Sequence, residues 1–266
     1  MKYKCLSIAG FDGSGGAGIQ ADLKTFSALG CYGMTVLTAL PVQNTCGVRA
    51  CYDIPLSCIE EQLEAIFDDI IPDAIKIGML FSEDVIHLVT DFLEKNAKNI
   101  PIVLDPVMIA KSGDPLLLPE AIKTLKNRLL PIITVITPNL PEAYALTNSQ
   151  EQIEIQAKKL IDFGANAVFI KGGHASGNNC NDLLLEQNQL PIELNSKRIH
   201  SQNTHGTGCT LSAAICAFLA RGSSLLESCQ KAKYYLTRAI LASKDMKMGQ
   251  GFGPVHHFYE MWKEIP

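Results

Sequence analysis

Several apolar runs of the sequence end in residues that are suited to binding phosphate groups. Asp105 and Lys171 each directly follow such a run, and the turn 206–208 (Gly-Thr-Gly) precedes an apolar stretch that begins at Cys209. Phosphates bind backbone amides at a helix N-terminus, Mg²⁺ takes carboxylate and water ligands, and a lysine can lie against the transferred charge. These residue types together predict phosphoryl transfer from a nucleotide.

Each of these features also has an ordinary structural interpretation. An aspartate after a strand often caps a turn, a lysine at a strand end is usually solvated, and adjacent glycines often only form a turn. The sequence has no G-x-x-x-x-G-K-[ST], so the chain is not a P-loop protein. Gly13, Gly15 and Gly18 have G-x-G-x-x-G spacing, but Gly10 already ends the preceding strand, which argues against a Rossmann dinucleotide site. The interpretation as a site therefore depends on whether the features meet in space.

Cys209 lies at the junction of the glycine turn and the apolar stretch, where packing, a disulfide, a metal or chemistry could explain it. The chain has nine cysteines, an odd number, and no C-x-x-C pair. This pattern argues against a disulfide framework and against a zinc cage. Most of the cysteines are predicted to be buried thiols, and packing is the simplest interpretation of Cys209 as well.

The composition is that of a globular protein. The 266 residues are 47% hydrophobic and 19% charged, with a formal net charge of −4, which is enough apolar material for a sizeable core. The charges are spread along the chain, so no basic face indicates nucleic acid or an anionic membrane. The first residues contain too short an apolar stretch for a signal peptide, and no run approaches a membrane span of roughly 20 residues. We expect a cytoplasmic protein.

Strand patterns and helix patterns alternate along the chain. Short apolar runs rich in β-branched residues predict strands, and caps or 3.6-residue periodicity predict helices. The predicted strands are 3–10, 34–42, 73–80, 100–106, 133–138 and 167–173. The predicted helices are 18–30, one opened by a capping box of Ser57 and Glu60, one capped by Ser82, about 119–130, about 151–163, 208–220 and 224–244. Residues 181–201 are expected to form less regular β-structure at an antiparallel edge.

The alternation predicts an α/β fold with a central, mostly parallel sheet flanked by helices on both faces. No linker, repeat or low-complexity tract interrupts it, so we expect residues 1–266 to form a single domain. Ligands of open parallel sheets bind at the carboxyl ends of the strands. The segments 10–18, 78–79, 105–107, 137–143 and 171–173 all follow predicted strands, so we expect them to converge on one site.

Longer stretches of the sequence carry a resemblance to a known family. They are, in order, "AGFDGSGGAGIQADLKTFSALG", "VQNT", "KIGML", "VLDPVMIAKSGDPLL", "TPNLPEA", "KGGH", "HGTGCTLSAA" and "GFGPVHHF". Together they resemble the hydroxymethylpyrimidine kinase / phosphomethylpyrimidine kinase family of thiamine biosynthesis, nearly from end to end. The resemblance implies the ribokinase-like fold. It also implies transfer of the γ-phosphoryl group of ATP to 4-amino-5-hydroxymethyl-2-methylpyrimidine and then to the resulting monophosphate.

The resemblance further implies roles for individual residues. Five residues would surround the pyrimidine: Gln43, which would hydrogen-bond its edge, and Gly10, Asp22, Met79 and Val107. Two carboxylates would hold Mg²⁺ through water: Asp105 and Glu142. The residues implied for ATP and the transferred phosphoryl group are Lys171, Asn139, the anion hole Gly206, Thr207 and Gly208, and Cys209. A homodimer is expected on the same ground.

Cys209 differs from the residue usual in the wider superfamily, and Phe11 differs from the residue usual in the family. The wider superfamily usually has an aspartate base at the position of Cys209, whereas the pyrimidine kinases are similar to this chain in having cysteine. A helix N-terminus favours a thiolate, although nearby phosphates oppose it, and a neutral thiol would not repel a largely dianionic monophosphate. Phe11 departs from the family, which usually has Ser or Thr there, so a hydroxyl donor is lost and an aromatic face is gained.

Three other functions remain as alternatives. A pyridoxal or pyridoxine kinase is the nearest, because relatives of this branch accept the vitamin B6 ring, but Gln43 and Met79 favour the pyrimidine. A non-catalytic sensor of ATP or pyrimidine is expected to have lost some of the phosphate-site residues, and all of them are present. A sugar kinase is disfavoured because position 209 lacks the expected aspartate.

Overall fold

The structure is a computed structural model that describes residues 2–108, 117, 119–174 and 177–262. The middle of the motif "VLDPVMIAKSGDPLL", residues 109–116, lies outside the described residues, and so do residues 175–176, which follow the motif "KGGH". No helix in the described part is long and apolar enough to cross a bilayer.

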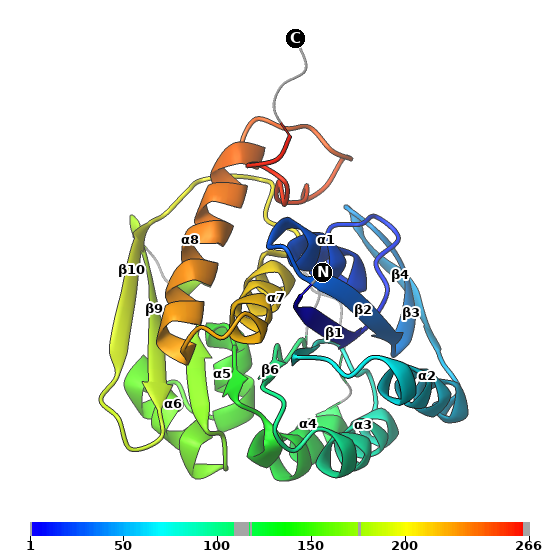
Figure 1. The fold of residues 1–266 in the computed structure, drawn as a ribbon. Coiled ribbons are helices and arrows are strands. Elements are labelled where there is room, and N and C mark those ends of the chain that lie inside the picture. The colour runs from blue at the N-terminus through cyan, green and yellow to red at the C-terminus, as the bar shows by residue number, and fades with distance from the viewer. Residues whose placement is uncertain (1, 109–116, 118, 175–176, 263–266) are drawn as a thin grey trace.

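Within the described residues, eight strands form one sheet in the order β10-β9-β8-β7-β6-β5-β1-β2 (Figure 1). Their bounds are β1 Lys4–Ala9, β2 Tyr32–Leu37, β5 Ala74–Ile77, β6 Ile102–Leu104, β7 Val135–Ile136, β8 Ala167–Ile170, β9 Asn179–Glu186 and β10 Ile192–Lys197. Six strands, in the order β2, β1, β5, β6, β7 and β8, pair in parallel. At one edge β9 pairs antiparallel with β8, and β10 pairs antiparallel with β9. The mostly parallel sheet and its antiparallel edge are confirmed.

Helices cover both faces of this sheet (Figure 1). One face packs against α1 Gly18–Ala28, α7 Thr207–Ala220 and α8 Leu225–Ser243. The other face packs against α2 Leu56–Asp69, α3 Glu83–Asn96, α4 Pro119–Thr124, α5 Leu140–Thr147 and α6 Ile153–Asp162. Because both faces are covered, the inner strands are buried and mostly apolar, and all four residues of β5 are buried, including Lys76.

A second, two-stranded antiparallel sheet stands apart from the main one. It consists of β3 Ala39–Asn44 and β4 Gly47–Asp53. The prediction of one strand over 34–42 was wrong, and β4 was missed. The chain leaves the main sheet at Thr38, whose hydroxyl donates to the Met79 carbonyl oxygen at 2.5 Å. An isolated two-stranded ribbon is marginal in water, so this ribbon needs attachments to the rest of the protein.

Of the two helix caps predicted for these segments, one is confirmed and one was wrong. Ser82 caps α3, as predicted, by accepting a hydrogen bond from the Val85 amide. The Ser57–Glu60 capping box was wrong, because α2 begins at Leu56 after Pro55 and has no side-chain cap.

Two further helical segments also differ from the predictions. The predicted helix 119–130 ends early, and a π-helical turn, η1 Leu125–Leu129, and a 3-10 turn, η2 Leu130–Ile132, follow α4. A third short helix, η3 Gly172–His174, follows β8. Helix α5 was not predicted, although its cap contributes directly to the site described below.

Candidate active site

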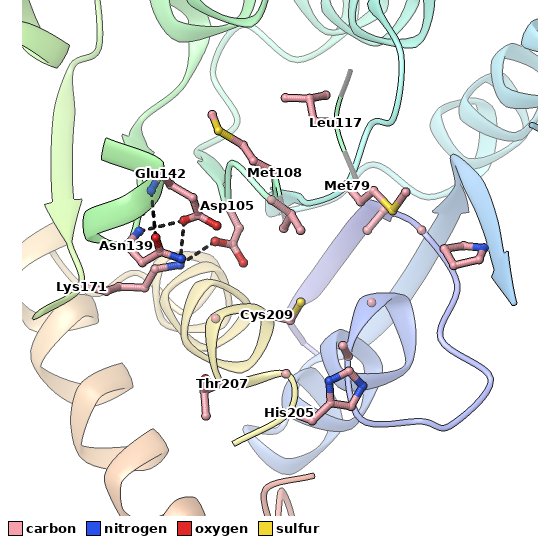
Figure 2. A pocket seen from close by; sticks show the side chains of 18 of the residues that line it. Met79, Asp105, Met108, Leu117, Asn139, Glu142, Lys171, His205, Thr207 and Cys209 are labelled. Carbon is pink, nitrogen blue, oxygen red and sulfur yellow. Dashed lines mark hydrogen bonds and ion pairs between the residues drawn. The ribbon is translucent and has the colours of Figure 1, made fainter. Parts of the chain in front are cut away.

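A cavity of about 790 Å³ opens at the carboxyl ends of the parallel strands (Figure 2). It is lined by residues that follow β1, β5, β6 and β8 and by the first residues of α1, α5 and α7. All but one of the residues singled out from the sequence line it: Gly10, Gln43, Met79, Asp105, Val107, Asn139, Glu142, Lys171, Gly206, Thr207, Gly208 and Cys209. The exception is Asp22, which lies below the cavity floor.

The polar half of the cavity is organised around the ammonium group of Lys171 (Figure 2). Lys171 Nζ lies 2.8 Å from Asp105 Oδ1 and 3.8 Å from Glu142 Oε2. Burial alone would lower the pKa of Lys171, but the two carboxylates raise it above its ordinary value. The lysine therefore stays charged, which suits a group that neutralises phosphate oxygens.

Glu142 owes its position to the cap of α5. Asn139 accepts a hydrogen bond from the Glu142 amide at 2.9 Å, and the Glu142 carboxylate accepts one from the Asn139 amide at 2.8 Å. This reciprocal capping box turns the glutamate toward the cavity. Burial raises the pKa of Glu142 to about 7, with Asp105 adding to the effect of burial and Lys171 opposing it. The sequence N-L-P-E has the spacing of such a box, so the helix could have been predicted from it.

Helix α7 begins at the centre of the cavity wall. Its N-cap, Gly206, has φ +75°, and a Cβ there would lie 1.7 Å from the Gly16 carbonyl oxygen. Only glycine permits both this backbone conformation and this close approach. A Cβ on Gly208 would lie 3.3 Å from both Asp105 Oδ2 and Lys171 Nζ. The N-terminus of α7, with its partial positive charge and amide donors, therefore lies against the ion pair of Lys171.

The pair of Asp12 and His205 was not predicted from the sequence. The Nε2 atom of His205 lies 2.7 Å from Asp12 Oδ2, and the histidine lines the cavity directly before Gly206. Asp12 is fully buried, and it also accepts hydrogen bonds from the backbone amides of Ser14, Gly16 and Ala17. The pair joins the first glycine loop to the turn that opens α7.

The other half of the cavity is mainly apolar. Its lining comprises Ala9, Gly10, Phe11, Pro41, Gln43, Met79, Val107, Met108 and Leu117. A Cβ on Gly10 would lie 3.0 Å from Met79 Sδ, so the glycine allows Met79 to pack closely over the end of β1. An apolar pocket with a single carboxamide fits a neutral ring that carries a few polar edge atoms.

Asp22 and Lys76 form an ion pair at the cavity floor, where Lys76 lines the cavity and Asp22 lies beneath it. Both side chains are fully buried, and Lys76 Nζ lies 2.8 Å from Asp22 Oδ2, which also accepts a hydrogen bond from the Ser7 hydroxyl at 2.5 Å. Burial alone would lower the pKa of Lys76, but Asp22, together with Cys209 and Asp105, raises it. Asp22 therefore contacts Lys76 rather than the cavity. Lys76 was missed, although a lysine inside the apolar run of 73–80 is itself an informative signal.

Cys209 reaches the cavity between two helix N-termini. The backbone of Gly18, the first residue of α1, hydrogen-bonds its thiol, and Cys209 keeps partial exposure. Burial nevertheless raises the pKa of Cys209 to about 11, and the positive charge of Lys76 only partly offsets this. The thiolate favoured by the helix dipole in the sequence argument does not form near neutral pH, and the thiol is neutral there.

The donor set fits a magnesium ion that binds with a nucleotide. Asp105 and Glu142 supply carboxylate oxygens, the ligands that Mg²⁺ prefers, next to the N-terminus of α7. No group of three or more His, Cys, Asp or Glu side chains that could hold a metal occurs among residues 2–108, 117, 119–174 and 177–262. Mg²⁺ commonly binds through one or two carboxylates together with water and substrate phosphates, so the two carboxylates are sufficient for this mode of binding.

Comparison with known proteins gives a consistent result. The family model for phosphomethylpyrimidine kinase matches residues 12–256. The hydroxymethylpyrimidine/phosphomethylpyrimidine kinase of Rhizobium meliloti is 47% identical over 269 residues, which cover 99% of this chain and all of that protein. The thiamine biosynthesis bifunctional protein ThiED of Geobacter sulfurreducens is 43% identical over 95% of this chain and 51% of its own length.

A solved structure is similar over the same extent. The ADP complex of Bacillus subtilis pyridoxal kinase is 37% identical in sequence and superposes with a TM-score of 0.89. The match covers 99% of this chain and all of that chain.

The buried Asp22–Lys76 pair predicts a large cost of removing one partner. Lys76→Met should lower the free energy of unfolding by about 3–5 kcal/mol, because it leaves the Asp22 carboxylate buried without a counter-charge. The double variant Asp22→Asn/Lys76→Met should be distinctly more stable than the single one. Urea unfolding measures both. Lys4→Met is the control, since Lys4 pairs with Asp73 at the surface at 3.7 Å, where about 1 kcal/mol or less is expected. Equal losses for Lys76→Met and Lys4→Met would contradict the prediction.

The raised pKa of Cys209 predicts slow alkylation. Thiolates react with iodoacetamide and thiols do not, so Cys209 should resist modification at pH 8 and react only as the pH approaches 11. Cys46 and Cys58, which are exposed, serve as internal controls when peptide mass spectrometry follows each site. Modification of Cys209 at pH 8 as fast as that of Cys46 would show that its thiol is not shifted.

Proposed function

The chain belongs to the phosphomethylpyrimidine kinase family and has the ribokinase-like fold, and on this basis we propose that it phosphorylates an aminopyrimidine twice with ATP. The first acceptor is the hydroxymethyl group of 4-amino-5-hydroxymethyl-2-methylpyrimidine, the second is the resulting monophosphate, and the diphosphate serves thiamine biosynthesis. One observation carries the proposal. A single cavity joins an apolar half containing Gln43 to a polar half built from Lys171, Asp105, Glu142 and the start of α7.

The apolar half is proposed to hold the pyrimidine. Gln43 offers a donor and an acceptor to the edge of an aminopyrimidine, and Met79 and Val107 pack against the ring. Asp22 was expected beside the ring. Its ion pair with Lys76, which lines the cavity, supports an indirect role in which Asp22 holds Lys76 in position.

The polar half is proposed to hold the phosphates of ATP. Lys171 lies against the γ-phosphate, Asn139 lies beside the nucleotide, and the amides of Gly206, Thr207 and Gly208 form the anion hole. Asp105 and Glu142 hold Mg²⁺, which when bound neutralises the phosphate oxygens as charge builds up in transfer. This assignment uses the helix N-terminus where an anion is most stable.

Cys209 is proposed to position the acceptor oxygen where the two halves meet. In the first step this oxygen bonds to the γ-phosphorus, the bond from phosphorus to the β-γ bridging oxygen breaks, and the hydroxyl proton is released. A thiol whose burial raises its pKa to about 11 is a poor acceptor for that proton at neutral pH. It can hydrogen-bond the hydroxyl and, being neutral, tolerates the monophosphate dianion in the second step.

A second candidate acceptor is pyridoxal. The support for it is the close similarity to the Bacillus subtilis pyridoxal kinase structure over the whole chain. Pyridoxal, like the pyrimidine, is a nitrogen heterocycle with a hydroxymethyl group, so it offers the same kind of acceptor oxygen. The carboxamide of Gln43 favours the aminopyrimidine because it can pair with both an amino group and a ring nitrogen. We further propose that residues 1–266 act as one kinase domain, as a homodimer, in the cytoplasm.

The assignment predicts an order among acceptors. ADP release should be measured with the pyrimidine, its monophosphate and pyridoxal, each over a range of concentrations. Both pyrimidine acceptors should give a higher kcat/KM than pyridoxal. A higher kcat/KM for pyridoxal would indicate that pyridoxal, and not the pyrimidine, is the preferred acceptor. ADP release with none of the three would refute the proposal.

The proposed magnesium ligands predict a loss of turnover with little loss of acceptor binding. Asp105→Asn and Glu142→Gln should each lower kcat by roughly 100-fold, because the lost charge acts mainly in the transition state. The pyrimidine Kd from calorimetry should change little. Asp91→Asn, at an exposed carboxylate that pairs with Arg128, should leave both quantities unchanged. A variant at 105 or 142 that keeps the parent kcat would remove that residue from the site.

A further inference from the structure

Two aromatic side chains that line the cavity have no role in the function proposed above. Phe11 and Phe252 both line the cavity, and they are 36% and 43% exposed. Large aromatic residues that remain this exposed inside a concave site usually mark a surface that a ligand covers. We propose that Phe11 and Phe252 contact the faces of the acceptor ring and determine specificity for a planar, neutral heteroaromatic acceptor. The inference rests on the function proposed above.

Backbone hydrogen bonds attach one phenylalanine to each end of strand β3. The Phe11 amide donates to the carbonyl oxygen of Ala39, the first residue of β3, at 3.1 Å. The Phe252 amide donates to the carbonyl oxygen of Thr45, the residue after β3, at 3.0 Å. The two aromatic residues are thus about one strand length apart and are attached to one element.

The strand between these two attachments turns alternate side chains into the cavity. Pro41 and Gln43 line it, whereas Leu40 and Val42 point outward and are 39% and 45% exposed. This is the two-residue periodicity of a strand with one covered face. The inner face of β3 therefore presents Gln43 to the cavity, between the two ends of the strand to which Phe11 and Phe252 are attached.

The two attachments are tightly packed. A Cβ on Gly13 would lie 3.2 Å from Phe11 Cε1, so the glycine loop supports the ring from behind. On the other side, the Gly251 amide donates to Thr45 Oγ1 at 3.2 Å, and a Cβ on Gly251 would lie 1.9 Å from the Thr45 carbonyl oxygen. These contacts hold Phe11 and Phe252 in place before a ligand binds.

The chemistry of the surroundings sets the class of ligand. Apart from Gln43, the lining of this half consists of apolar side chains and backbone. The charged residues of the lining are Lys76 at the floor, where it pairs with Asp22, and Asp105, Glu142 and Lys171 in the polar half. A sugar would leave hydroxyl groups unpaired here at a cost, whereas an aromatic heterocycle can stack on phenylalanine and use Gln43 at its edge. The planar ring of the acceptor is thus recognised by the phenylalanines, and the polar atoms at its edge are recognised by Gln43.

The test compares acceptor binding in matched variants without turnover. Binding of the aminopyrimidine to the parent, Phe11→Leu and Phe252→Leu is measured by calorimetry. Each leucine variant should bind about tenfold more weakly, since it loses the aromatic face but keeps apolar volume. Phe11→Tyr keeps the face and should bind as the parent does. Tyr52→Leu is the control, because Tyr52 is 62% exposed on β4 and does not line the cavity.

Binding of AMP-PCP and thermal unfolding should be unchanged in all four variants, which separates a local effect from misfolding. Parent-like acceptor affinity in both leucine variants would overturn this inference and leave the proposed function intact. So would equal weakening in Tyr52→Leu, since it would indicate a general effect on the ribbon. A parent protein that binds no pyrimidine would overturn both proposals.

Discussion

The buried carboxylate of Asp12 holds two glycine loops together, and the rest of the site depends on this contact. It accepts hydrogen bonds from three amides of the loop that opens α1 and pairs with His205, the residue before the turn that opens α7. Burial alone would raise the pKa of Asp12, but the hydrogen bonds from His205 and Ser14 hold it well below its ordinary value. The carboxylate therefore stays ionised, and two helix N-termini meet at one point, where their partial positive charges add.

Buried ion pairs then fix the charges around that point. Asp105 pairs with Lys171, and Asp22 pairs with Lys76 at the floor of the cavity. A third pair, Asp182 with Lys233, positions the backbone beside Lys171. Asp182 also accepts a hydrogen bond from the amide of Gly172, which directly follows Lys171. Buried pairs of this kind contribute little net stability compared with apolar packing. Their value here is that they hold charged groups in fixed positions at the ends of parallel strands.

The alternating pattern of apolar runs was sufficient to predict the parallel sheet, because burial on both faces leaves a continuous apolar signature in each strand. It was not sufficient to predict where the chain leaves that sheet. The run 34–42 is continuous in sequence, and its division at Thr38 depends on a hydrogen bond to Met79, far along the chain. Helix α5, by contrast, has a local signal in the sequence, which is the spacing of its capping box. The helix was nevertheless not predicted.

Twelve residues of the cavity lining were predicted, because they belong to segments that follow strands or to the motifs that carry the family resemblance. The residues that were missed act through contacts between distant segments, which no local pattern records. His205 is defined by Asp12, 193 residues away in sequence, and Lys76 by Asp22, 54 residues away. The position of Asp22 below the floor follows from the same pair, since its carboxylate is turned toward a lysine on the inner strand β5.

The two halves of the cavity are joined by neighbouring peptide groups near the end of the described chain. Phe252 donates its amide to Thr45 on the β3–β4 ribbon, and the carbonyl oxygen of Gly253 accepts a hydrogen bond from the His205 amide at 2.9 Å. The acceptor wall and the turn that opens α7 are therefore attached to adjacent residues of one segment. Phosphoryl transfer depends on holding two reactants at a fixed separation, because most of the catalysis is positioning and charge stabilisation. A ribbon too small to be stable alone thereby acquires a defined distance from the phosphate site.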